Sequence, residues 1–147
     1  MTNELATTNT NNTNNDIVIP NGAFNTIDMS DFNGAVRLAN AINASGSLAE
    51  YVQNNNNPEL PVVDIIVTNG VRKGRNGMDD MPCEDTRLIL ADGTSLLSQS
   101  TGIANSARWI AGILGTAIHE GILLQVVTQQ LNNGNTIKNL RIVGKMQ

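Results

Sequence analysis

The C-terminal two thirds of this chain alternates short apolar runs, rich in β-branched residues, with breaks made of turn-forming residues. The pair Asp92–Gly93 and the polar stretch at 132–135 are typical of tight β-hairpins, while residues 71–85 have the character of a long loop. The pattern predicts five strands, at residues 62–67, 86–91, 95–99, 122–129 and 136–143.

The spacing of apolar residues changes between the third and the fourth predicted strands. From Ile103 to Leu114 they recur every three or four positions, as on one face of an α-helix. Gly115 follows and suits the C-terminal end of such a helix. We therefore predict a helix over residues 101–114.

The N-terminal third has a different pattern. Residues 1–16 are rich in Asn and Thr and nearly free of apolar side chains, so burial cannot offset the entropy of ordering them, and we expect a disordered arm. Ser30 and Ser47 are candidate N-caps of two helices. The first of these helices carries one apolar stripe, made of Phe32, Ala35, Val36, Ala39 and Ile42.

The predicted order from residue 62 is strand, strand, strand, helix, strand, strand. An OB-fold has this order, in which a three-stranded meander, a helix and a closing hairpin build a five-stranded barrel. Closure removes free sheet edges, and the helix covers the apolar open end. The sequence thus predicts a mainly β, α+β domain over 17–147, with a barrel at about 60–145 after a helical N-terminal segment.

Composition restricts the class of protein. The 147 residues suffice for one domain. No run reaches the roughly eighteen apolar residues of a membrane helix, and the N-terminus lacks the pattern of a secretory signal. The single cysteine, Cys83, cannot build a disulfide framework. We expect a cytoplasmic protein without membrane contact.

The net charge of −4 argues against a simple basic nucleic-acid binder, but the charge is unevenly distributed. One basic residue faces seven acidic ones before Val71, whereas eight basic residues face six acidic ones from Arg72 onward. The positive charge therefore belongs to the predicted barrel.

The loop between the first two predicted strands carries Arg72, Lys73 and Arg75, with glycines between and after them. In an OB-fold this loop flanks the ligand groove together with the loop between strands four and five. Its cations can follow a phosphate backbone and release counterions. A solvated turn is the alternative, because the same loop carries four neutralising acids: Asp79, Asp80, Glu84 and Asp85.

Further candidates for binding DNA lie outside this loop: Arg87 on the second strand, Arg108 and Trp109 on the helix, and Lys138 and Arg141 on the fifth strand. Lys138 and Arg141 are three positions apart, so they point to opposite faces, and at most one can line a shared groove without a bulge. Trp109 can stack on a base or belong to the core, and ordinary surface charge is the alternative for the cations.

Patterns that indicate catalysis or metal binding are missing from the sequence. His119 is the only histidine, and no serine-hydrolase or phosphate-loop motif occurs. We therefore expect no enzymatic activity, no metal and no cofactor.

Four stretches together resemble the single-stranded DNA-binding proteins encoded by phages and conjugative plasmids of Gram-positive bacteria. They are SLAEYV at 47–52, TRLIL before Asp92–Gly93–Thr94, SQSTGIANS at 98–106 and NGNTIKNL at 133–140. The resemblance implies an OB-fold that coats single-stranded DNA during phage replication or plasmid transfer in a bacterial host. Leu96 and Leu97 depart from relatives that often carry an aromatic residue there, and residues 1–45 lie outside the match.

Two functions follow from these observations. The first is non-catalytic, largely sequence-independent binding of single-stranded DNA, with replication or transfer proteins as partners. The second is a structural or adaptor module that binds another protein, which the acidic charge and the scarcity of aromatic residues favour. We also expect a homo-oligomer. Residues 17–19 are apolar and β-prone, so they either pair with a neighbouring molecule or pack on their own barrel.

Overall fold

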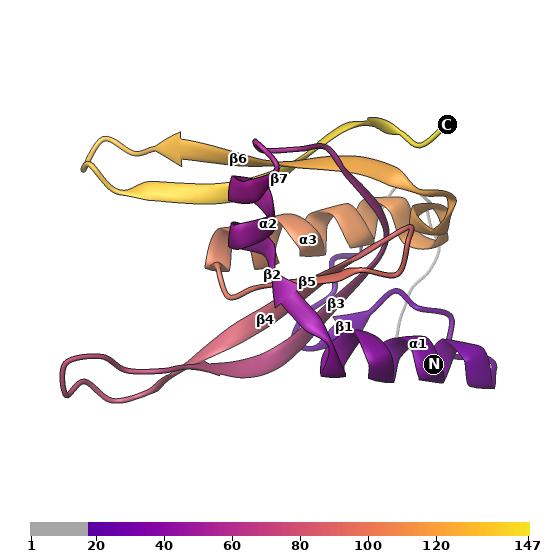
Figure 1. The fold of residues 1–147 in the computed structure, drawn as a ribbon, viewed down its shortest axis with the longest axis horizontal. Helices are drawn as coiled ribbons and strands as arrows, with labels where there is room; N and C mark the ends of the chain where they lie inside the picture. Colours follow the sequence, from indigo (N-terminus) through magenta and orange to yellow (C-terminus); the bar gives the residue numbers. More distant parts are fainter. Residues whose placement is uncertain (1–17) are drawn as a thin grey trace.

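The computed structural model describes residues 18–147, so the predicted arm at 1–16 lies outside the described residues. It has an α+β fold with one open sheet of seven strands, three α-helices and a 3₁₀ helix (Figure 1). The elements are β1 (Phe24–Asn25), α1 (Phe32–Asn43), β2 (Ser45–Ser47), α2 (Leu48–Asn54), β3 (Leu60–Arg72), β4 (Met81–Leu90), β5 (Ser95–Ser98), α3 (Thr101–Leu114), the 3₁₀ helix η1 (Gly115–Glu120), β6 (Ile122–Gln130) and β7 (Thr136–Lys145).

The sheet runs in the order β2-β5-β4-β3-β6-β7, and β1 pairs with β3. The long strand β3 joins the two halves: its first three residues pair with β6, and the rest pairs with β4. The register shifts between Val62 and Asp64, where such an irregularity bends a strand. The sheet therefore curves, and α3 lies between the β6–β7 hairpin and the strands β3 to β5 (Figure 1).

The helix α3 confirms the predicted helix, and both ends fall where the sequence placed them. Ser100 caps it by accepting a hydrogen bond from the backbone N–H of Ile103 at 3.3 Å. Ile103, Ala107 and Ile110 are buried in the main core cluster, together with apolar residues of β3, β4 and β6. Burial of each large aliphatic side chain contributes about 1.5–3 kcal/mol, which explains why this periodic segment folds as predicted.

The predicted five-stranded barrel is not confirmed, because the sheet stays open at β7. Along its free edge β7 meets α3: the N–H of Leu140 donates to Ser106 Oγ at 3.1 Å. Gly102 packs so closely on the carbonyl oxygen of Lys138 that a Cβ atom would collide with it. A helix therefore covers the edge that a neighbouring strand covers in a closed barrel.

The N-terminal segment differs from the predicted helical lead-in, because two short strands are interleaved with its helices. β2 lies between α1 and α2 and pairs parallel with β5, and β1 pairs with β3. The N-cap of α1 is Asp31 rather than Ser30, since its carboxylate accepts from the N–H of Gly34 at 3.0 Å. Ser47 caps α2 as predicted.

The long loop predicted at 71–85 is wrong in its extent, because seven of its fifteen residues, 71–72 and 81–85, continue the two strands. Pairing of β3 with β4 runs without a break from Asp64 and Ile89 to Arg72 and Met81, which leaves residues 73–80 as the connection. Gly70 and Pro82 weaken the intrinsic strand signal here. Pairing that starts in the core overrides it, as strand propensity depends strongly on context.

The described residues contain no helix that combines the length and the apolar character needed to cross a bilayer. Of the β-prone segment predicted at 17–19, residues 18 and 19 are described, and they pack against α3 of their own chain. A Cβ atom at Gly112 would lie 2.7 Å from the carbonyl oxygen of Val18 and 2.9 Å from Ile19 Cδ1. This contact agrees with the intramolecular alternative for residues 18 and 19.

Candidate nucleic-acid interface

Two hairpins, β3–β4 and β6–β7, extend from the same side of the molecule (Figure 1). The tip of β3–β4 turns at Asn76 and Gly77, which have φ angles of 56° and 81°. Asn-Gly with positive φ at both residues is the pair that a tight hairpin turn favours. The sequence carries this turn signal within residues 71–85, where the prediction of a long loop does not account for it.

Three adjoining hollows form a groove that starts between these hairpins. The first, about 500 Å³, lies among α2, β6 and β7; the second, about 600 Å³, lies along β2 and β5; the third, about 520 Å³, lies at the β3–β4 hairpin. Ser98 and Lys138 line both the first and the second hollow, and Arg72 and Gln99 line both the second and the third. The shared lining makes the groove continuous.

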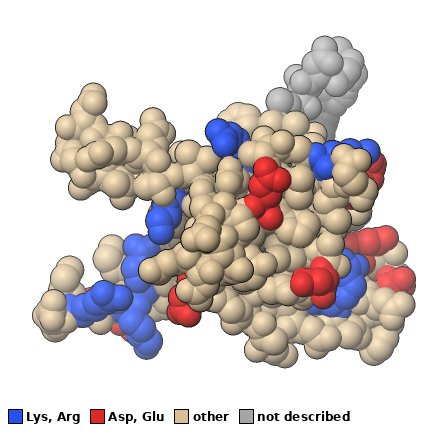
Figure 2. Space-filling model, turned by 45° about the horizontal axis from the view of Figure 1, so that its top comes forward, with Lys and Arg blue, Asp and Glu red and all other residues tan. Residues whose placement is uncertain are grey.

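Five of the predicted cations line this groove. Arg141 lines the first hollow, Lys138 the first two, Arg72 the second and third, and Lys73 and Arg75 the third. Figure 2 shows basic side chains on the lower projecting arm and on the surface between the two arms. The structure thus brings together cations that lie up to about 70 positions apart in the sequence.

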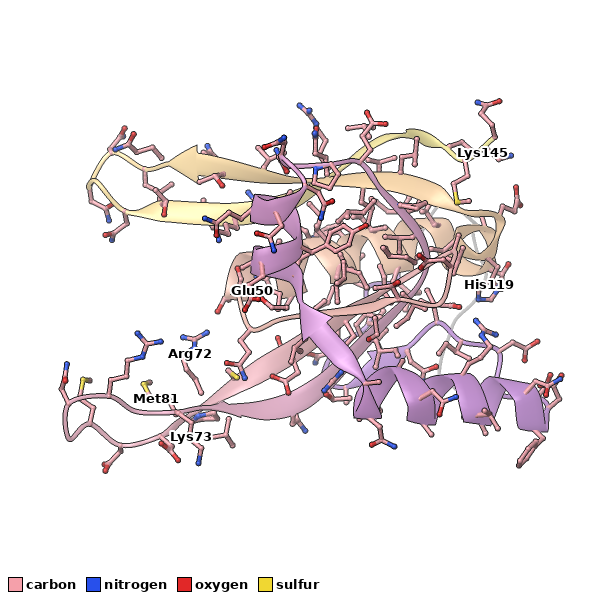
Figure 3. The ribbon with its side chains drawn as sticks, viewed as in Figure 1. Glu50, Arg72, Lys73, Met81, His119 and Lys145 are labelled. Atoms are coloured by element: carbon pink, nitrogen blue, oxygen red, sulfur yellow. The ribbon has the colours of Figure 1, made fainter. Side chains whose placement is uncertain are left out.

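Arg72 is positioned at the middle of the groove. It ends β3 directly opposite Met81, the first residue of β4, so both side chains leave the same face. Figure 3 shows both of them pointing into the space between the hairpins. The guanidinium donates to the backbone carbonyl of Gln99 at 2.6 Å, and among the described residues it forms no ion pair.

Lys73 points the opposite way in Figure 3 and is the one cation of the loop that a neighbouring acid neutralises. Its Nζ lies 3.4 Å from Asp80 Oδ2, and Asp80 also accepts the backbone N–H of Gly74 at 2.8 Å. Of the four acids in this region, Asp79 lines the third hollow, while Glu84 and Asp85 bond to Arg108 and Gln99. Local neutralisation therefore applies to Lys73 rather than to Arg72.

The third hollow has an apolar wall that the sequence reading missed. Val71, Met78 and Met81 line it and are exposed by 56%, 70% and 59%. Exposed apolar side chains beside cations are unusual on a solvated turn, and methionine adapts readily to flat partners. The Asn76–Gly77 turn signal, which places these residues on a hairpin, could have identified them from the sequence as neighbours of the cations.

Lys138 and Arg141 both line the first hollow, which contradicts the expectation that at most one can share a groove. No register shift separates them. Instead, the hollow reaches both faces of the β6–β7 hairpin. Four consecutive residues of the partner strand, Gln125 to Thr128, also line it, and successive residues of a strand point to opposite faces. Arg141 donates to Gln125 Oε1 at 3.3 Å, so its guanidinium lies alongside the hairpin.

Arg87 and Arg108 belong to the framework, by which we mean the sheet and the segments packed on it, and they do not line the groove. Arg87 is only 8% exposed, and it donates to Ser45 Oγ at 2.7 Å and to Thr68 Oγ1 at 3.2 Å. Arg108 forms an ion pair with Glu84 and donates to the carbonyl oxygen of Gly22 at 2.8 Å. Neither guanidinium is available to a phosphate chain in the groove.

Trp109 is 54% exposed on α3, so it is not a core residue, but it lines none of the three hollows. The groove has no aromatic residue in its described lining. The apolar part of its lining therefore consists of aliphatic and methionine side chains.

A second polar cluster surrounds Asp64, which is buried in β3. Its carboxylate accepts from Thr26 Oγ1 at 2.7 Å, lies 3.0 Å from His119 Nε2 and pairs with Arg37. His119 Nε2 also lies 2.7 Å from the carbonyl oxygen of Thr26, so this nitrogen carries the proton. With every group satisfied, the cluster fastens β1, α1 and η1 to the sheet.

Reactive groups are not gathered elsewhere in residues 18–147. No three His, Cys, Asp or Glu side chains there converge as metal ligands. Burial raises the pKa of the Cys83 thiol, and the nearby Asp85 carboxylate raises it further, so the thiol stays protonated at neutral pH.

Comparisons with known proteins do not assign a function to this groove. No protein-family model matches the chain, no curated protein matches it, and no solved structure matches it. The chemistry of the groove itself is therefore what indicates a function.

Proposed function

We propose that this protein binds single-stranded DNA non-catalytically in the groove between its two hairpins. The observation that carries the proposal is the continuous lining by Arg72, Lys138 and Arg141, with an apolar wall at one end. Cations along a groove contact successive phosphates, and each contact releases counterions. Such a site follows one strand and needs no base pairing.

The apolar wall can provide the contacts with base faces that aromatic residues often provide in such sites. Unstacked bases have flat apolar faces, and Met78 and Met81 present adaptable apolar side chains next to the cations. A duplex hides these base faces inside its stack, so the same wall favours single strands. Phosphate contacts and apolar contacts carry little sequence information, and we expect weak sequence preference.

The global charge of −4 does not oppose this proposal, because the cations that matter lie on one side of the molecule (Figure 2). Attraction within a Debye length of about 8 Å at physiological salt is decided by local charge. Glu50, on α2 near the groove, is exposed and reduces the attraction without blocking the groove.

The test is a fluorescence anisotropy titration with a long, unstructured oligonucleotide at two salt concentrations, beside a duplex of equal length. With three phosphate contacts, affinity falls roughly ten- to twentyfold between about 50 and 200 mM salt. The duplex should bind more weakly than the single strand at each concentration. Absence of binding at low salt, or equal affinity at both salt concentrations, contradicts the proposal.

In the cell, we propose a role in phage replication or plasmid transfer, where long single strands need cover. A second candidate is an adaptor module that binds protein, and a specific observation favours it: an apolar helix surface on α1 remains exposed. Protein capture through α1 and DNA binding in the groove use different surfaces, so groove variants separate the two candidates.

A further inference from the structure

The apolar stripe predicted for the first helix exists, but it faces away from the sheet. α1 packs on the sheet through Leu38 and Ala41, which join Ile27, Ile66 and Ile89 in the second core cluster. Gly34, on the same side of the helix, is also buried. Gly34 approaches so closely that a Cβ atom there would collide with the carbonyl oxygen of Asp28. This contact fixes which side of the helix is buried.

The opposite side is apolar and exposed among the described residues. Phe32, Ala35, Val36, Ala39 and Ile42 fall within about 120° of arc at 3.6 residues per turn, and all five are exposed. Phe32 is the extreme case at 81%. A soluble helix normally turns such a stripe to the core, so an outward stripe marks an interaction surface.

The charge and size pattern of the stripe fits a copy of itself. The helix has one charged residue, Arg37, and its guanidinium turns to the buried Asp64, which leaves the stripe uncharged. A large side chain lies at each end, Phe32 and Ile42, and alanines lie between them. When two such helices pair antiparallel about a two-fold axis at position 37, residue 32 faces 42 and residue 35 faces 39.

We propose that two copies of this chain associate through their α1 helices in this antiparallel register. Alanine facing alanine lets the helix axes approach to the lower end of the usual 8–10 Å range, and each phenylalanine covers the partner's isoleucine. An isologous contact of this kind closes after two copies, so it gives a dimer and not a filament. A surface without charge offers nothing to a charged partner such as DNA.

The contact between the two α1 helices is small, so we expect the dimer to be weak. A 12-residue helix is about 18 Å long, so the pair buries less than the roughly 800 Å² per partner of a standard interface. The dimer should therefore dissociate on dilution. α1 lies at the end of the molecule opposite the two hairpins (Figure 1), so pairing leaves both grooves open. This inference does not depend on DNA binding.

The test uses full-length chains with opposite charges placed on the stripe. The variants A35E/A39E and A35K/A39K each set like charges against each other in the proposed register and should be monomeric, with the dissociation constant raised at least about tenfold. Mixed in equal amounts, they should form a one-to-one heterodimer. Sedimentation velocity over a range of concentrations measures all three samples. Glu and Lys are good helix formers, and circular dichroism checks that α1 survives.

The matched control is N33K/N40K, which adds the same charge to the same helix on exposed positions outside the stripe. It should dimerise like the parent chain. A parent that stays monomeric at every concentration overturns the proposal, as does a mixture of the two charged variants that shows no heterodimer. Deletion of residues 1–17 should leave the dimer in place, and its loss would make that segment the occupant.

Discussion

The framework and the groove of this protein use the same residue types for opposite purposes. In the framework, Arg87 and Arg108 are satisfied by hydroxyls, carbonyls and a carboxylate of their own chain. In the groove, Arg72 and Arg141 each bond to one uncharged group and keep other N–H donors for a ligand. The role of an arginine in this protein therefore follows from its distance to the core. The strand β4 connects the two regions, because it begins at the groove with Met81 and continues into the framework, where Arg87 lies.

The largest effect is expected from Gly102, which joins α3 to β7 and so holds the framework together. Gly102→Ala should lower the free energy of unfolding by about 2–4 kcal/mol, because the new methyl group collides with the Lys138 carbonyl oxygen. Urea denaturation measures the change. Gly46→Ala is the control, since its Cβ meets its nearest neighbour at an ordinary 3.9 Å. Equal stability of G102A and the parent would contradict the close contact.

Arg87→Ala tests whether this arginine belongs to the framework. Removing this nearly buried side chain leaves the half-buried hydroxyls of Ser45 and Thr68 without its hydrogen bonds, so the free energy of unfolding should fall by about 2 kcal/mol. DNA affinity of the folded variant should stay unchanged. Lys145→Ala is the control: its ion pair with Glu120 is exposed, at 3.1 Å, and contributes about 0.5 kcal/mol or less. A loss of affinity with intact stability would move Arg87 into the binding site.

The double variant R72A/K138A tests the groove from both hairpins at once. Affinity for the oligonucleotide should fall about tenfold at moderate salt, and the salt slope should drop by about one contact for each cation removed. Thermal stability should change little because both residues are at the surface. Lys73→Ala is the comparison variant: Lys73 lines only the third hollow and pairs with Asp80, so its loss should weaken binding less than the loss of Arg72. If K73A weakens binding as much as R72A does alone, the strand takes another path.

The smallest effect concerns the apolar wall. M78S/M81S should reduce affinity about three- to tenfold while the salt slope stays the same, because contacts to base faces release no counterions. Anisotropy titrations at several salt concentrations separate the loss of affinity from a change in the salt slope. Leu131→Ser, an exposed leucine after β6 near the tip of the other hairpin, is the control and should bind like the parent. An altered slope would show that the methionines act by positioning the cations.

Local elements could be predicted where one residue pattern repeats along the chain. The helix at 101–114 follows from its 3.6-residue period, and the turns at Asp92–Gly93 and Asn133–Gly134 follow from glycines that do adopt positive φ, 92° and 87°. The β3–β4 extension could not be predicted this way. Its strands carry weak β propensity and exist because their partners are already held in register by the core.

The candidate site likewise has residues that the sequence indicated and residues that it did not. The sequence indicated Arg72, Lys73 and Arg75, because they belong to a loop that flanks the ligand groove of an OB-fold. It indicated Lys138 and Arg141 only as cations of the fifth predicted strand. It also indicated Arg87 and Arg108, and no local pattern separates these two from the cations that line the groove. The sequence reading missed Met78, Met81 and Val71, which matter only once the turn at Asn76–Gly77 brings them beside Arg72.

The α+β class, the excess of basic residues after Val71 and the apolar stripe on the first helix could all be read from the amino-acid sequence. These are properties of composition and of short repeats, which act over a few residues. The three-dimensional structure was needed to show that the sheet stays open against α3, that Arg72, Lys138 and Arg141 line one groove, and that the stripe of α1 faces outward. Each of these depends on contacts between residues far apart in the chain, such as the close packing of Gly102 on the carbonyl oxygen of Lys138.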